Sequence, residues 1–178
     1  LSATPFRRDG LSKLIFWHLG DVHYRLEASD LVAGGQILDV EVVWRNTDFV
    51  AYADPVSEYS KMLSELTHND TRNRMIVADL AEEVNHSHRP GVCLVLSDRK
   101  LHCQVLQALL KHKHHVNAEL LTGDLSGEQR KAVVERVNSG AARVLIATGQ
   151  LIGEGFDCPR LSTLFLATPV RFSGRMMQ

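Results

Sequence analysis

Hydrophobic and polar positions along the second half of the chain follow two periods in turn. Short runs that are apolar throughout, such as Val144–Ala147, indicate strands that are buried on both faces. The longer segments between these runs have apolar residues three or four positions apart, which indicates amphipathic helices. This alternation predicts strands at 92–97, 116–121, 143–147 and 162–167, and helices at 99–113 and 126–140.

The two helices of this half have recognisable faces and ends. In the first, Leu101, Val105 and Leu109 recur at near-helical spacing, so we expect them to lie on the buried face. The second begins at Ser126, a residue type that caps helices well, and Gly140 ends it.

The first half of the chain is less regular. Apolar residues at helical spacing stop at Gly20, and glycine commonly ends a helix. Ser29 stands where it would cap a short helix, and alternating apolar residues on both sides of that helix favour strands. The pattern predicts a helix at 11–19, a strand at 22–26, a short helix at 29–35, a strand at 37–45, and two helices between 55 and 87, the second at 71–87.

Strands that alternate with helices predict an α/β fold built from parallel β-α-β units. In such a sheet the ligand crevice lies beyond the carboxyl ends of the strands. Three strands are followed there by a hydroxyl side chain, namely Ser97, Thr122 and Thr148. Each could be a simple helix cap, but three hydroxyls at one edge favour a site for phosphate oxygens.

Composition limits the classes of partner. The 178 residues carry a formal net charge of -1, so a nucleic-acid site would have to be a local groove. Three cysteines without C-x-x-C spacing predict reduced thiols in a cytoplasmic protein, with no disulfide framework and no metal site. Apolar runs are too short for a membrane span, and no membrane partner is predicted. Because the chain starts without Met, we expect it to be a fragment.

Four segments carry a family resemblance. They are "SATP" at 2–5, "CLVLSDRKLHCQVL" at 93–106, "LLTGDLSGEQRKAVVERVNSGAARVLIAT" at 120–148 and "ATGQLIGEGFDCP" at 147–159. In order and spacing they resemble the motifs of superfamily 2 helicases near the DEAD/DEAH-box group, in the restriction and repair branch. The match is to the second RecA-like motor domain of that family.

This resemblance implies a three-layer α/β/α RecA-like domain with a mostly parallel sheet. Residues 1–20 would be the end of the first motor domain, and 21–178 the second, cut at the start of the sixth motif, where Gln178 stands. The function implied is that of the C-terminal motor domain of an ATP-dependent nucleic-acid helicase or translocase. Its partners would be nucleic acid, with DNA favoured over RNA, and the upstream first RecA-like domain.

The resemblance also implies site residues. Thr148 would contact a nucleic-acid phosphate, and Asp157 would face the ATP cleft, near the ribose. The residues predicted to bind nucleotide are Glu154, Gly155 and Asp157, and those predicted to bind nucleic acid are Ser97, Asp98, Arg99, Thr122, Gly123, Arg130, Thr148 and Gly149.

Catalytic residues are not predicted within the chain. The sequence contains neither G-x-x-x-x-G-K-[ST], which would hold the phosphates of ATP and help to hold Mg²⁺, nor the acidic quartet of the family. ATP and Mg²⁺ are therefore expected as cofactors of the full-length enzyme, with none bound by this chain alone.

Two other functions stay open. One is a non-catalytic RecA-like module that binds nucleic acid or regulates another protein. The other is a Rossmann-like small-molecule enzyme, which the pattern disfavours because no strand is followed by G-x-G-x-x-G.

Overall fold

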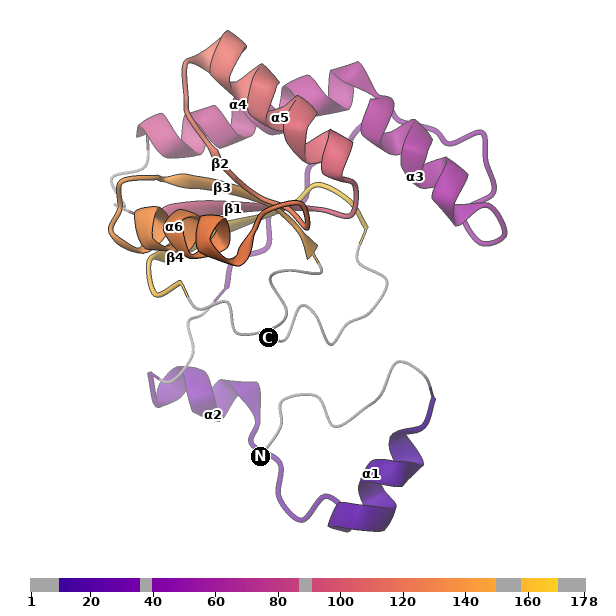
Figure 1. Cartoon of the computed structure of the whole chain (residues 1–178). Coiled ribbons are helices and arrows are strands. Elements are labelled where there is room, and N and C mark those ends of the chain that lie inside the picture. Colours follow the sequence, from indigo (N-terminus) through magenta and orange to yellow (C-terminus); the bar gives the residue numbers. More distant parts are fainter. Residues whose placement is uncertain (1–9, 36–39, 87–90, 150–157, 170–178) are drawn as a thin grey trace. The chain divides into compact units, whose positions relative to one another are not determined.

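The computed structural model describes residues 10–35, 40–86, 91–149 and 158–169 (Figure 1). The chain divides into two compact units. The larger is Asp48–Arg171, and the smaller combines Leu1–Thr47 with Phe172–Gln178. The domain boundary placed after residue 20 from sequence stays a prediction.

Two helices form the described secondary structure of the smaller unit, α1 (Ser12–Leu19) and α2 (Ala28–Ala33). Both confirm the predicted helices. Gly20 ends α1 with a positive φ of 82°, and its N–H donates to the carbonyl of Phe16. The predicted cap of α2 is wrong: Ser29 lies inside the helix, and Glu27 is the N-cap.

The strands predicted in this unit are also wrong in the part that the structure describes. Residues 22–26 and 40–45 contain no strand, and 37–39 lie outside the described ranges. Alternating apolar side chains favour a strand only when a sheet buries one face. Here Tyr24 is 80 % exposed and Trp44 86 % exposed.

A parallel four-stranded sheet forms the centre of the larger unit. Its strands lie in the order β2-β3-β1-β4, and every described pairing is parallel. Consecutive parallel strands need crossover connections, and helices supply two of them (Figure 1). The strands are β1 (Val92–Ser97), β2 (Glu119–Leu121), β3 (Val144–Thr148) and β4 (Leu161–Leu166).

Helices cover both faces of this sheet. The helices α4 (Asp70–His86) and α5 (Lys100–His114) share one apolar cluster with β1 and β3, while α6 (Gly127–Asn138) shares a second cluster on the other face (Figure 1). The helix α3 (Tyr59–His68) precedes α4 and packs on the segment around Ala53. This arrangement confirms the predicted three-layer α/β/α fold.

The buried face of α5 differs from the prediction. Leu101 is 59 % exposed, and Val105 and Leu109 are only half-buried. The fully buried positions are one residue further along, at His102, Leu106 and Leu110, together with Cys103. A polar residue takes part in this face because it has buried polar partners, which an apolar period cannot reveal.

The strand β4 departs from the expectation of burial on both faces. Its residues are alternately half-buried and exposed, and Leu164 and Leu166 are among the exposed ones. The strand lies at the outer position beside β1 in the described sheet, so its apolar composition does not lead to full burial.

The helix α6 begins as predicted. Ser126 accepts a hydrogen bond from the Gln129 N–H at 3.2 Å, and the Gln129 side chain accepts the Ser126 N–H at 2.9 Å. This reciprocal capping box satisfies two backbone donors at the helix start. Gly140 follows the helix with a φ of 81°.

Gly91 provides a test of how β1 and β4 pack. A Cβ at this position would lie 2.2 Å from Cβ of Ser162. We expect Gly91→Ala to lower the free energy of unfolding by about 1–3 kcal/mol, because β4 must shift to admit the methyl group. Urea denaturation measures this loss.

Two further variants make that measurement specific. Ser162→Gly in the Gly91→Ala background removes the clashing atoms and should restore most of the stability. Gly127→Ala is the control, since a Cβ there meets nothing within 4 Å. Equal stability of Gly91→Ala and the wild type would contradict the packing.

Candidate nucleic-acid interface

The carboxyl ends of β1, β2 and β3 bring the predicted hydroxyl residues together. Ser97 pairs with Thr148 across β1 and β3, and Leu121 pairs with Ala147 across β2 and β3. Thr122, the next residue, therefore reaches the same edge. The parallel register alone produces this cluster from three segments that are far apart in the sequence.

Ser97 is the most deeply buried of the three, at 1 % exposed. Its Oγ lies 2.9 Å from Nδ1 of His102, and it accepts the Arg99 N–H at 3.2 Å. The hydroxyl is thus already used inside the protein. Its role in binding phosphate stays a prediction.

His102, which the sequence did not mark as functional, is 2 % exposed. Its Nε2 lies 2.9 Å from Oδ1 of Asn73, whose Nδ2 donates to the carbonyl of Thr67 at 2.9 Å. Burial, helped by the nearby charges of Arg72 and His68, lowers the pKa of His102 to about 4. The imidazole is therefore neutral at pH 7.

The turn after β1 is tied to neighbouring elements. The backbone N–H of Asp98 donates to Oγ1 of Thr168 at 3.0 Å, while the Asp98 side chain is exposed. The guanidinium of Arg99 donates to the carbonyl of Ser60 at 3.0 Å and to its hydroxyl at 2.7 Å. Arg99 therefore anchors the turn to α3.

The loop after β2 is held by its own arginine. Arg130 donates to the carbonyls of Leu125 at 3.1 Å and Gly123 at 3.3 Å. Thr122 is buried, while Gly123 is exposed. Lys100, a further residue that the sequence did not mark, pairs with Asp124 of this loop.

Thr148 and Gly149 are half-buried at the end of β3. Across the described residues, the Thr148 hydroxyl has no hydrogen-bond partner. The predicted nucleotide-binding residues Glu154, Gly155 and Asp157 lie outside the described ranges, so their roles stay predictions.

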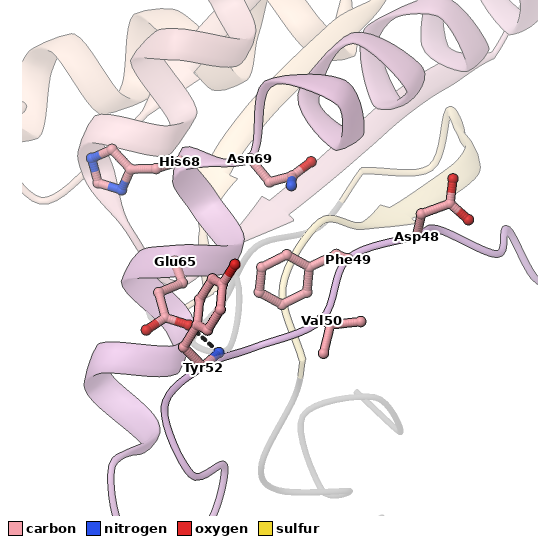
Figure 2. Close-up of a pocket in the computed structure, with 7 residues that line it drawn as sticks. All are labelled: Asp48, Phe49, Val50, Tyr52, Glu65, His68 and Asn69. Carbon is pink, nitrogen blue, oxygen red and sulfur yellow. Dashed lines mark hydrogen bonds between the residues drawn. The ribbon is translucent and has the colours of Figure 1, made fainter.

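A pocket of about 480 Å³ lies at the corner between α3 and α4 (Figure 2). The carboxylate of Glu65 accepts the Tyr52 N–H there at 2.8 Å and the Ala53 N–H at 3.3 Å, which holds the segment before α3. None of the predicted site residues lines it. The lining consists of Asp48, Phe49, Val50, Tyr52, Glu65, His68 and Asn69.

In the described part of the chain, no three His, Cys, Asp or Glu side chains are grouped as metal ligands. No described helix is both long and apolar enough to span a membrane. The cytoplasmic location predicted from the cysteines stays a prediction.

A parallel sheet in this strand order between two helical layers, with its hydroxyl residues gathered at the carboxyl edge, defines a RecA-like α/β domain. The family model described as helicase conserved C-terminal domain matches residues 72–178, more than half of the chain. The chain belongs to this family, which confirms the predicted resemblance to the C-terminal domain of helicases.

Solved structures agree on the fold. S. cerevisiae Dbp5 bound to RNA and ADP BeF3 is similar with a TM-score of 0.50 and 20 % identity, over 59 % of this chain and 27 % of that one. The helicase domain of Pyrococcus furiosus Hef is similar with a TM-score of 0.50 and 18 % identity, over 67 % of this chain and 26 % of that one.

A viral relative matches over the whole chain. It carries the provisional name helicase 22, comes from Sulfolobus islandicus filamentous virus (isolate Iceland/Hveragerdi), and is 23 % identical over 192 residues. This chain spans 33 % of that relative.

Proposed function

We propose that the chain is the C-terminal motor domain of an ATP-dependent nucleic-acid helicase or translocase. It would contact the phosphate backbone at the carboxyl edge of its sheet and form one side of an ATP cleft between two domains. The observation that carries this proposal is the parallel register, which pairs Ser97 with Thr148 and brings Thr122 to the same edge of the sheet.

Contacts of this type suit a motor that moves along a strand. Small hydroxyls and backbone N–H groups bind phosphate oxygens without reading the base. They also need no strongly basic surface, in agreement with the net charge of -1. Thr148, Gly149 and the exposed Gly123 are the proposed contacts, while Arg99 and Arg130 also hold the turns in place.

ATP and Mg²⁺ would be held mainly by another domain. The chain has no phosphate loop, and the residues proposed to face the nucleotide, Gly155 and Asp157, follow Thr148 within one segment. That segment would connect the nucleic-acid contact to the ATP cleft. DNA as the preferred strand is part of the same proposal.

We expect the 178-residue chain alone to show no ATP hydrolysis that single-stranded DNA stimulates. The given sequence contains neither the phosphate loop nor the Q-x-x-G-R-x-x-R motif that supplies an arginine finger in this family. An arginine finger by itself is worth about 10³–10⁵ in rate in NTPases that have one. A coupled-enzyme assay with and without DNA tests this, with the full-length protein as the positive control. Stimulated turnover by the chain alone would contradict the proposed division of roles.

Asp157→Ala tests the nucleotide end of the segment in the full-length protein. Loss of a hydrogen bond that the charged Asp157 carboxylate would accept from a ribose hydroxyl should raise the KM for ATP roughly tenfold. Nucleotide-free affinity for single strands should stay close to wild type. The opposite result, weak strand binding with normal turnover, would mean that the two ends of the segment have exchanged roles.

A further inference from the structure

A series of hydrogen bonds passes through the turn after β1, and the backbone of α3 closes it into a ring. It begins on α3, where Ser60 accepts from the Arg99 guanidinium, and the Arg99 N–H donates to Ser97 Oγ. Ser97 contacts His102, His102 contacts Asn73, and Asn73 returns to α3 at the carbonyl of Thr67. The ring therefore touches both ends of α3 and links it to β1, α4 and α5.

The direction of each bond follows from Asn73. Its Nδ2 donates to the carbonyl of Thr67, so its Oδ1 faces His102 and accepts the proton on Nε2. A neutral imidazole then has Nδ1 as an acceptor, and the Ser97 hydroxyl donates to it. The Ser97 oxygen is left to accept the Arg99 N–H. Ser97 thus serves the turn and does not offer its proton outward.

We propose that His102 is a positioning residue for the nucleic-acid edge. Its two ring nitrogens link Ser97 to Asn73 and thereby fix the conformation of the turn Ser97–Lys100. This inference rests on the proposed function, because the turn matters only if that edge binds a strand. The bond from the Asp98 N–H to Thr168 restrains the same turn from the β4 side.

Filling space in the core does not by itself account for a histidine at this position. His102 lies among apolar residues of α5 that are also fully buried, such as Cys103 and Leu106. An apolar side chain could fill that space, whereas a ring in which the buried donors and acceptors are matched selects one geometry for the turn.

Three substitutions at His102 separate the two bonds. In His102→Asn, the side-chain oxygen replaces Nδ1 and can still accept from Ser97. His102→Gln keeps only a donor toward Asn73, and His102→Phe keeps neither bond. Leu106→Ala is the control, a fully buried residue of the same helix that acts through packing alone.

The first measurement is amide exchange of Arg99 by NMR in the full-length protein, at a temperature where every variant is folded. We expect exchange to rise roughly threefold to tenfold in the Gln and Phe variants and to stay near wild type in the Asn and Leu106→Ala variants. The second measurement is affinity for an oligo-dT strand. This affinity should fall in the Gln and Phe variants and stay near wild type in the Asn and Leu106→Ala variants.

The two measurements distinguish an error in the positioning role from an error in the proposed function. Exchange in the Gln and Phe variants no faster than in Leu106→Ala would overturn the positioning role. Exchange that changes as expected, while neither these variants nor Thr148→Val alters oligo-dT affinity, would overturn the proposed function of this edge and leave the ring as a support of the turn.

Discussion

Thr148→Val should weaken binding of single-stranded oligonucleotides to the full-length protein by about tenfold to a hundredfold. A hydrogen bond to a charged phosphate contributes roughly 1.5–3 kcal/mol, and about 1.4 kcal/mol corresponds to a tenfold change in affinity. Val keeps the branched shape of Thr. Since the substitution removes only the hydroxyl of a half-buried side chain, thermal stability should stay almost unchanged.

The comparison needs several unrelated sequences, as DNA and as RNA, at one salt concentration. Phosphate contacts carry no base information, so the loss should be similar for every sequence. Thr163→Val is the matched control: this Thr lies in β4, and its hydroxyl donates to Glu83 at 2.8 Å. It should lose stability and keep affinity. Unchanged affinity in a folded Thr148→Val protein would contradict the phosphate contact.

His102 should make the larger unit sensitive to mild acid. Its pKa falls from 6.5 to about 4 in the folded protein, so the unfolded chain takes up a proton below pH 6.5 and the folded chain does not. The part of the free energy of unfolding that depends on neutral His102 is fully present above pH 6.5 and is lost as the pH falls toward 4. The full loss is about 3 kcal/mol, since each pKa unit corresponds to about 1.36 kcal/mol.

Denaturant unfolding between pH 7 and pH 4.5 measures this loss in the wild type and in His102→Asn. Carboxylates titrate in both proteins, so the difference between the two pH profiles isolates the imidazole. The Asn variant should start less stable and lose less on acidification. Parallel profiles would show that His102 accepts a proton in the folded state as easily as in the unfolded one.

Much of the larger unit could be predicted from the periods of its apolar residues. The strands β1 and β3 are buried on both faces, and their continuous apolar runs predict this burial. Local signals also sufficed at Ser126, where the capping box involves only residues within one turn. The grouping of Ser97, Thr122 and Thr148 followed from a general rule of parallel sheets.

The errors arose where an apolar pattern depends on a partner. Trp44 and its neighbours alternate as a strand would, but a strand forms only beside another strand. On α5, Leu101 and His102 both fit a helical period, and the polar partners of His102 decide which of them is buried.

The sequence by itself determined the α/β class, the order of the elements in the larger unit and the edge where the candidate site lies. These features depend on the spacing of residues that are close together in the sequence. Only the tertiary structure decided that the Ser97 hydroxyl points inward and that the Thr148 hydroxyl lacks a described partner. Asn73 stands 29 residues from His102 in the chain, and only folding places their side chains in contact.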